Sequence, residues 1–379
     1  MRILHIVTRG SGGGTSRSID HMLQYERSLG HEVYLITGSL VIEDRYEMTS
    51  RFLKREIHPL FDLLAWYDLY RRIKSINPDL IHTHESKAGI LGRLNSKGKG
   101  QVIAHTVHMA TFSTNWFQIS LIANVSQVFE YWASKRTDYL YFVGKELADI
   151  YEKKRIKGRI SSSVARSFLG VESFGKVLNR KYDQAEIFKE LGLPDGARIV
   201  LTVGLLEKRK NHSFIINSLA KMLLTNSDVY LLIAGSGRFQ NNLEELCLKL
   251  QVSHKVHFLG FRNDIARLMN SADVLVHASK IEGVPQAIVQ AIVSNVPVVC
   301  LRSCGIDELN GATVVRREPN VYSNAVRDVL QGRNHLSSGE AQRVILQSWS
   351  QLEIEKTWEA NLAEVEKLLK RRSKENLGY

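Results

Sequence analysis

The chain has 379 residues, of which 44% are apolar, and it carries a formal net charge of +12. This length exceeds one ordinary hydrophobic core and fits two domains of common size. No apolar run approaches the roughly 20 residues of a membrane-spanning helix, and the three cysteines lack the spacing of a disulfide framework or a zinc site. These features argue against a membrane-spanning, disulfide-rich or zinc-binding protein, and the reducing cytoplasm is the expected compartment.

The excess of basic residues predicts an anionic partner. Residues 1–178 contain 25 Lys and Arg against 17 Asp and Glu, whereas the remainder contains 26 against 22, so the first half carries most of the excess. No nucleic-acid-binding motif or low-complexity basic arm accompanies this charge. A phosphorylated substrate or an anionic membrane surface is therefore favoured over nucleic acid.

The first half alternates short apolar runs with helical patterns. Strands are predicted at 3–8, 33–37, 80–83 and 102–106, and the first helix at 18–29. Short β-branched runs separated by helices are typical of parallel strands with crossover connections. This half is predicted to form a doubly wound parallel sheet.

The second half repeats the pattern after the polar stretch 172–184. Its strands are predicted at 198–204, 229–234, 256–259, 274–277 and 296–300. We therefore expect an α/β protein with two Rossmann-like domains, residues 1–178 and 179–350, that face a cleft. Residues 351–379 predict a C-terminal helix that packs back toward the first domain.

Open sheets of this kind bind ligands beyond the carboxyl ends of their strands. The first such loop is the glycine-rich run 10–16, which includes Gly13 and Gly14. Glycine lets the backbone approach a ligand closely, and the N-terminus of the following helix favours a phosphate. A diphosphate cradle and a tight turn without a ligand are equally compatible with this motif alone.

Histidines follow two other strands of the first half. His108 comes after the fourth strand, where an imidazole can hydrogen-bond a sugar or a phosphate, or simply cap a loop. His82 and His84 end the third strand, close to Lys87, and their alternation places both on one strand face. The simplest interpretation of this pair is that both are solvated loop residues.

Three consecutive cations follow the first strand of the second half. Lys208, Arg209 and Lys210 come shortly after Gly204. Cations at a strand end are well placed to meet a diphosphate and to offset the charge of a leaving group. The alternative is a solvated run of charges.

A carboxylate and a turn follow the strand at 274–277. Glu282 precedes the turn Gly283-Val284-Pro285, after which a helix begins. Such a carboxylate can accept hydrogen bonds from sugar hydroxyls while the helix N–H groups hold phosphate, or it can cap the helix. Gln290 lies eight residues later, about two turns along, on the same helix face.

Together these motifs resemble the family-4 glycosyltransferases, which are retaining enzymes of the GT-B fold. The resemblance covers nearly the whole chain, and its three firmest parts stand in family order. They are Gly13-Gly14 followed by Gly30-His31-Glu32-Val33, then 78–84 leading into Lys87-Ala88-Gly89, and Glu282-Gly283-Val284-Pro285 leading into Pro297-Val298-Val299.

The resemblance implies roles for individual residues. His108 is expected near the transferred sugar, Lys210 at the diphosphate and Glu282 at the donor sugar, and these are the expected catalytic residues. His84 and Lys87 are expected on the acceptor side. The family uses no metal, so neither a metal nor another cofactor is expected. Donor binding is implied for Gly13, Gly14, Gly204, Arg209, Phe261, Gly283, Val284, Pro285, Gln286 and Gln290.

Two departures from the family pattern concern the donor. Leu205 stands where the family has an arginine, so one of two cations on the diphosphate is missing. Gln290 stands where a second glutamate takes the ribose hydroxyls, and a neutral amide accepts more weakly than a carboxylate.

The leading hypothesis is a retaining hexosyl- or N-acetylhexosaminyltransferase that uses a UDP- or GDP-linked sugar. Its acceptor is expected to be a glycan or a lipid-linked sugar in surface polysaccharide or lipopolysaccharide biosynthesis. The alternative is a catalytically weak or inactive GT-B protein that binds sugar nucleotides or glycans. A nicotinamide oxidoreductase is disfavoured because the run 10–15 does not match the dinucleotide-binding fingerprint.

An aromatic and apolar segment in the first half predicts peripheral attachment at the inner face of the membrane. Apolar burial and attraction to anionic headgroups would act together there. The alternative is that most of these side chains pack inside the first domain. The residues are Trp116, Phe117, Ile119, Leu121, Ile122, Phe129, Tyr131 and Trp132.

Overall fold

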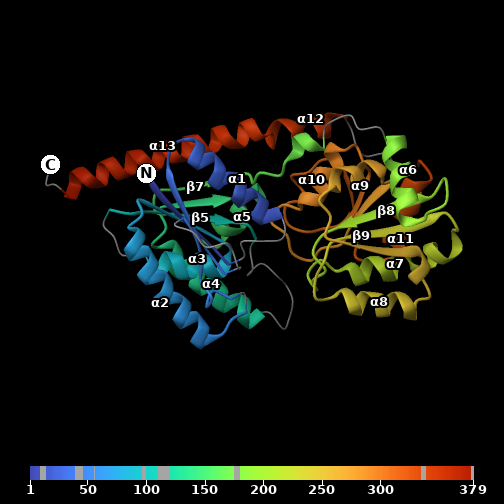
Figure 1. Ribbon diagram of the computed structural model, residues 1–379, viewed down its shortest axis with the longest axis horizontal. Coiled ribbons are helices and arrows are strands. Elements are labelled where there is room, and N and C mark those ends of the chain that lie inside the picture. The colour runs from blue at the N-terminus through green and yellow to red at the C-terminus, as the bar shows by residue number, and fades with distance from the viewer. Residues whose placement is uncertain are drawn as a thin grey trace. The chain divides into compact units, whose positions relative to one another are not determined.

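The computed structural model describes residues 1–8, 14–38, 46–54, 56–95, 100–109, 120–174, 180–333 and 339–376. Two compact units make up the chain (Figure 1). Unit 1 comprises Met1–Phe168 with Leu352–Tyr379, and unit 2 comprises Leu169–Gln351. The sequence pattern had placed this division after residue 178. It falls earlier here because the short helix η1 (Val171–Ser173) packs against a helix of unit 2.

Unit 1 contains a seven-stranded parallel sheet with the order β3-β2-β1-β4-β5-β6-β7. The order changes direction between β1 and β4, which is where open α/β sheets place their ligands. The elements are β1 Arg2–Val7, α1 Gly14–Ser28, β2 Glu32–Thr37, β3 Glu47–Thr49, α2 Pro59–Ile76, β4 Leu80–His84, α3 Ser86–Asn95, β5 Val102–Val107, α4 Ser120–Ser134, β6 Tyr139–Phe142, α5 Lys145–Lys153, β7 Ser161–Val164 and α13 Gln351–Asn376.

Apolar cores cover both faces of this sheet. Ile3 and Val7 of β1 pack with α1 and with Trp358 of α13 on one face, whereas Leu4 and Ile6 pack with α2 on the other. The near-continuous apolar run of β1 is what a strand buried on both faces requires. His5 lies between Ile3 and Val7 in the alternation, so its side chain points toward the face that α1 and α13 cover.

Unit 2 contains a six-stranded parallel sheet with the order β10-β9-β8-β11-β12-β13, and its order changes direction between β8 and β11. An apolar core of unit 2 lies between the sheet and the helices α7, α8 and α11. The elements are η1, α6 Arg180–Leu191, β8 Arg198–Val203, α7 His212–Thr225, β9 Val229–Ala234, α8 Gln240–Lys249, η2 Ser253–Lys255, β10 Val256–Gly260, α9 Ile265–Ser271, β11 Val274–His277, α10 Gln286–Val293, β12 Val298–Leu301, β13 Ala312–Val315, α11 Pro319–Leu330 and α12 Gly339–Ser348.

Every strand predicted from an apolar run is present, and the prediction of two parallel-sheet α/β domains is confirmed. Four strands were missed: β3, β6, β7 and β13. Among the described residues, no helix is both long enough and apolar enough to cross a bilayer.

Candidate functional site

The first candidate site lies in unit 2, where the loops after β8 and β11 meet. Lys280 donates its backbone N–H to the carbonyl of Arg209 at 2.8 Å, and the side chain of Asn211 donates to the carbonyl of Ala278 at 3.2 Å. Ser279 donates its hydroxyl to the same carbonyl of Arg209 at 3.2 Å. These bonds hold the basic loop and the acidic loop side by side at the point where the strand order changes direction.

Glu282 is the centre of this site. Its Oε1 lies 2.5 Å from Nζ of Lys210, and its Oε2 lies 3.6 Å from a guanidinium nitrogen of Arg209. Nε2 of His277, the last residue of β11, lies 3.5 Å from the same Oε1. We call Lys210, Arg209, Glu282 and His277 the charged cluster.

The charge states of the cluster follow from its contacts. Burial alone would raise the pKa of Glu282, but Lys210, His277 and Arg209 together hold that pKa well below its usual value. Burial lowers the pKa of His277, the contact with Glu282 raises it in part, and the two cations lower it again, so that the net shift is downward. The cluster at neutral pH is therefore two cations, one carboxylate and one neutral imidazole.

Glycines allow the close backbone approaches around the charged cluster. Gly204 has φ +155°, a backbone conformation that favours glycine, and the stem of Lys210 lies beside it. Gly305 has φ +79°, and a Cβ there would overlap the carbonyl oxygen of Gly283. The turn after Glu282 therefore depends on Gly305, a residue that the sequence analysis did not single out.

The remaining donor-binding residues predicted in unit 2 lie close to this turn, in α10 or after β10. Pro285 is the N-cap residue of α10, so the alternative that Glu282 caps this helix is wrong. Gln290 is buried, and its amide N–H donates to the carbonyl of Leu169 at 3.5 Å. Its amide oxygen is the atom that the predicted ribose contact requires. Phe261 follows β10 and is 59% exposed, as a base-stacking residue needs to be.

The second candidate site lies in unit 1 and consists of histidines from three neighbouring strands: His5 within β1, His82 and His84 in β4, and His108 directly after β5. His5, His82 and His84 are completely buried, with ring centroids 4.2 to 5.3 Å apart. The interpretation of His82 and His84 as solvated loop residues is wrong, because the sheet, α1 and α13 enclose them. We call these three residues, with His108, the histidine cluster.

The histidine cluster is joined to a single buried carboxylate. Nε2 of His5 lies 2.7 Å from Oε2 of Glu26 in α1, and Trp358 in α13 donates its indole N–H to Oε1 at 2.9 Å. Nδ1 of His5 lies 3.0 Å from Nε2 of His84. Nδ1 of His84 lies 3.3 Å from Nε2 of His108.

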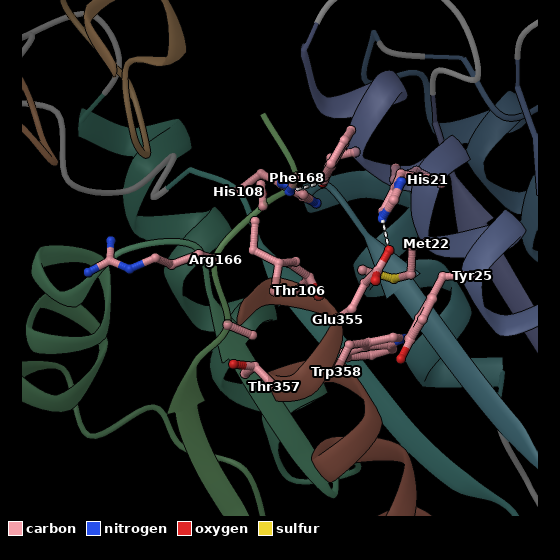
Figure 2. Close-up of a pocket in the computed structure, with 15 residues that line it drawn as sticks. His21, Met22, Tyr25, Thr106, His108, Arg166, Phe168, Glu355, Thr357 and Trp358 are labelled. Carbon is pink, nitrogen blue, oxygen red and sulfur yellow. Dashed lines mark hydrogen bonds and ion pairs between the residues drawn. The ribbon is translucent and has the colours of Figure 1, made fainter. Parts of the chain in front are cut away.

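His108, the last histidine in this row of contacts, lines a pocket. The pocket lies within unit 1, between α1, the end of β5, the segment 165–168 and the start of α13 (Figure 2). His21 stacks on Phe168 with ring centroids 3.8 Å apart and pairs with Glu355 at 3.1 Å. Burial lowers the pKa of His108 to about 4, so its imidazole is neutral at neutral pH.

Other predicted residues of unit 1 lie elsewhere or outside the described residues. Lys87 pairs with Asp62 of α2 at 2.5 Å. His84 contacts His108 rather than the surface, so any effect on an acceptor passes through His108. Gly13 lies outside the described residues, and Gly14 is the first residue of α1.

Exposed apolar side chains gather on α4. Phe129, Tyr131 and Trp132 are 50%, 41% and 67% exposed, so the alternative that they pack inside the domain is wrong. Leu60, Leu63 and Tyr67 are exposed on α2, which packs against the same helix, α3, as α4 does. The rest of the predicted segment, Trp116, Phe117 and Ile119 with the side chains of Leu121 and Ile122, lies outside the described residues.

Two family models match the chain. The model described as Glycosyltransferase Family 4 matches residues 12–161, and the model described as Glycosyl transferases group 1 matches residues 183–341. The first range falls in unit 1 and contains His82, His84 and His108 of the histidine cluster but not His5. The second range falls in unit 2 and contains the whole charged cluster.

Similar proteins include bacterial enzymes of glycan assembly. The UDP-Gal:alpha-D-GlcNAc-diphosphoundecaprenol alpha-1,3-galactosyltransferase of Escherichia coli is 31% identical over 68% of this chain and 65% of its own length. The lipopolysaccharide core biosynthesis glycosyltransferase LpsE of Rhizobium meliloti is 28% identical over 37% of this chain and 42% of its own length. Each match thus spans less than two thirds of the relative.

Solved structures resemble the chain over nearly its whole length. The crystal structure of Anabaena Alr3699/HepE in complex with UDP-glucose has a TM-score of 0.75 and 18% identity, and the match covers 96% of this chain and 100% of that chain. At this identity the likeness shows the fold alone. The GT-B fold expected from the sequence is confirmed.

Proposed function

We propose that the chain transfers a hexosyl or N-acetylhexosaminyl group from a UDP- or GDP-linked donor, with retention of anomeric configuration. The chain belongs to the family-4 and group 1 glycosyltransferases, and its motifs predicted family 4. The acceptor is a glycan or a lipid-linked sugar of surface polysaccharide or lipopolysaccharide biosynthesis. The names of the Escherichia coli and Rhizobium relatives support this acceptor class. The observation that carries the proposal is the charged cluster at the switch point of the unit 2 sheet.

The charged cluster supports each part of the donor reaction. Lys210 and Arg209 supply positive charge where a leaving diphosphate develops negative charge, which is the kind of fixed stabilisation that accelerates such a step most. Glu282 is ionised and therefore accepts hydrogen bonds from hydroxyls of the donor sugar. On the family's pattern, the leaving phosphate removes the proton of the acceptor hydroxyl on the front face of the sugar.

The reaction requires no metal in this proposal, because the two cations supply the charge that a metal supplies elsewhere. The experiment is to mix the protein with acceptor and a panel of UDP- and GDP-sugars, and to measure release of the nucleoside diphosphate with and without EDTA. We expect donor-dependent release that survives EDTA and a product with the anomeric configuration of the donor. Release that chelation abolishes and magnesium or manganese restores would contradict metal independence, and an inverted product would contradict retention.

A binding protein of the same fold is the second candidate, because Leu205 and Gln290 replace two charged groups of the family pattern. Such a protein would gain thermal stability with a nucleotide sugar but would release no nucleoside diphosphate when acceptor is added. Catalytic turnover therefore separates the two candidates.

We also propose a cytoplasmic protein whose apolar surface on α2 and α4 contacts an anionic membrane. Lys135 and Arg136 are exposed at the end of α4, and each basic residue near an anionic surface contributes about 1 kcal/mol to binding. Trp132→Ser should weaken co-sedimentation with anionic liposomes. Leu248→Ser is the matched control, since Leu248 is 68% exposed on unit 2 and Trp132 is 67% exposed. An equal loss of liposome binding in both variants, or equal binding of the wild type to neutral vesicles, would contradict the proposal that this surface binds an anionic membrane.

A further inference from the structure

The hydrogen bonds of Glu26, His5, His84 and His108 form one series. It begins at Glu26 and continues through His5 and His84 to His108, with N···O or N···N distances of 2.7, 3.0 and 3.3 Å. His5 and His84 each use both ring nitrogens in these contacts, whereas His108 uses only Nε2. The protonation state of one ring therefore determines that of the next.

Glu26 sets the direction of the series. Its carboxylate faces two nitrogens, and the indole N–H of Trp358 can only donate. The distance of 2.7 Å to His5 is typical of a charge-assisted bond to an ionised carboxylate, so Nε2 of His5 carries the proton. If the ring of His5 carries this one proton only, its Nδ1 is unprotonated and accepts from Nε2 of His84, 3.0 Å away.

The same rule applies to the next two rings. Burial lowers the pKa of His84 well below its usual value and that of His108 to about 4, so both rings are neutral at neutral pH. His84 donates through Nε2, so its unprotonated Nδ1 accepts from Nε2 of His108. His108 is left with an unprotonated Nδ1, to which no residue in the described part of the chain donates.

We propose that Glu26, His5 and His84 are positioning residues that hold His108 in the Nε2–H form, so that its Nδ1 accepts a hydrogen bond from a hydroxyl of a bound sugar substrate. The sugar in this statement rests on the proposed function. A hydroxyl fits because it can donate to Nδ1, whereas an ionised phosphate can only accept. The sequence analysis left sugar and phosphate open as partners of His108, and the series favours the sugar.

The last helix takes part in this arrangement. Trp358 of α13 occupies the second oxygen of Glu26, and its indole stacks on His82 with ring centroids 5.0 Å apart. His82 itself lies beside the series, with Nε2 2.8 Å from the hydroxyl of Thr106 and Nδ1 buried without a partner among the described residues.

A metal ion would produce the opposite result at His108. One ring nitrogen each of His5, His82 and His84 lies within 4.8 Å of the others. A metal requires an unprotonated ligand nitrogen. If that nitrogen of His84 is Nε2, which faces His5, then Nε2 would lose its proton and Nδ1 would carry it. His84 would then donate to His108, and Nδ1 of His108 would be protonated. Stoichiometric zinc in the purified protein, retained at this cluster, would therefore overturn the proposal.

The test measures the proton directly. In the full-length protein labelled with ¹⁵N-histidine, two-bond ¹H–¹⁵N spectra distinguish protonated from unprotonated ring nitrogens, and His108→Gln identifies the signals of His108 by their loss. We expect an unprotonated Nδ1 and a protonated Nε2 in the wild type. The reverse assignment would overturn the proposal without any need for a variant at Glu26.

Glu26→Gln should reverse the series. The single amide oxygen must accept from the indole, so the amide N–H₂ points at His5. The donor and the acceptor are then exchanged in every hydrogen bond of the series. We expect Nδ1 of His108 to become protonated. The sugar hydroxyl can then no longer donate to it and must turn to accept instead, so the KM for the sugar substrate should rise about tenfold, with a smaller change in kcat.

Trp358→Phe is the matched control. It removes the second partner of Glu26 but leaves the carboxylate free to accept from His5, so the tautomer of His108 should stay as in the wild type. An unchanged tautomer and KM in Glu26→Gln would overturn the proposal. If the tautomer switches but no donor supports transfer, the proposed function fails and the positioning role stands. If transfer proceeds and Glu26→Gln changes nothing, only the positioning role fails.

Discussion

The two polar clusters occupy equivalent places in two sheets of the same topology, yet their chemistry is opposite. The charged cluster of unit 2 brings two cations and an ionised carboxylate together within 3.6 Å. The histidine cluster of unit 1 joins buried imidazoles to the carboxylate of Glu26, and burial lowers the pKa of His82, His84 and His108. Both lie where the strand order changes direction. A common scaffold therefore presents fixed charge at one site and a neutral hydrogen-bond acceptor at the other.

This difference matches the two kinds of group in a glycosyl transfer. A diphosphate carries charge, and cations meet it best. Sugar hydroxyls are neutral donors and acceptors, and a neutral imidazole of fixed tautomer distinguishes them from phosphate. On this view, unit 2 holds the leaving group and unit 1 holds a hydroxyl.

The largest expected effect comes from removing either partner of the ion pair in the charged cluster. Glu282→Ala and Lys210→Ala should each reduce the rate of transfer by at least about a hundredfold, the scale expected for one preorganised charge-stabilising group. Thermal unfolding should show that both variants remain folded. The control is Glu353→Ala, which breaks an exposed pair with Lys356 and should leave the rate unchanged. A near wild-type rate in either cluster variant would mean that this cluster is not the donor site.

A smaller effect is expected from replacing Gly305, which contacts the turn after Glu282. Gly305→Ala places a Cβ against the carbonyl of Gly283 and should weaken nucleotide binding about tenfold by shifting Glu282. Gly196→Ala is a close control because it has the same φ of +79° but meets no atom within 4 Å. Both variants pay about 1 kcal/mol of backbone strain. Equal nucleotide affinity in the two variants, measured by calorimetry, would show that the turn after Glu282 is not part of the nucleotide-binding site.

Acid should affect the two clusters differently. Burial lowers the pKa of His82, so its ring stays neutral in the folded protein while the unfolded chain takes up a proton near pH 6.5. Its contribution to the free energy of unfolding is therefore lost as the pH falls below about 6.5. The pKa of Glu282 is lowered, so its contribution persists until the pH falls below the unfolded value of about 4.3.

This contrast can be measured between pH 7 and pH 5. His82→Gln should make the fall of the free energy of unfolding with decreasing pH shallower by about one proton, whereas Glu282→Gln should leave the slope over this range unchanged. His254→Gln, at an exposed histidine, is the control for His82 and should also leave the slope unchanged. Equal slopes in the His82 variant and the wild type would contradict a neutral, buried histidine cluster.

The sequence predicted most of the fold because buried parallel strands consist of apolar runs. Two of the four strands that it missed, β7 and β3, differ from this pattern, whereas β6 is itself a buried apolar run. β7 (Ser161–Val164) contains three serines and lies at the edge of its sheet, and β3 has only 3 residues. Their positions depend on pairing with a neighbouring strand rather than on their own composition.

The candidate sites were predicted only in part because their contacts join distant residues. Lys210 and Glu282 were each singled out from their place after a strand, but their pairing spans 72 positions. Glu26 and Trp358 carry no local motif, and they meet across 332 positions. His82 and His84 were found by their alternation but were assigned to solvent, since the helix that buries them comes from the other end of the chain.

The central claim is that charge in unit 2 and neutral imidazoles in unit 1 bind different parts of the substrates. Calorimetric titration of free UDP and GDP tests it most directly, because these ligands carry the diphosphate but no transferred sugar. We expect Lys210→Ala to reduce the affinity for the more tightly bound nucleotide at least about tenfold, as the loss of a charge-assisted contact predicts. We expect His108→Gln to leave this affinity within about twofold of the wild type. An equal loss in both variants, or no loss in Lys210→Ala, would contradict the division of roles between the two clusters.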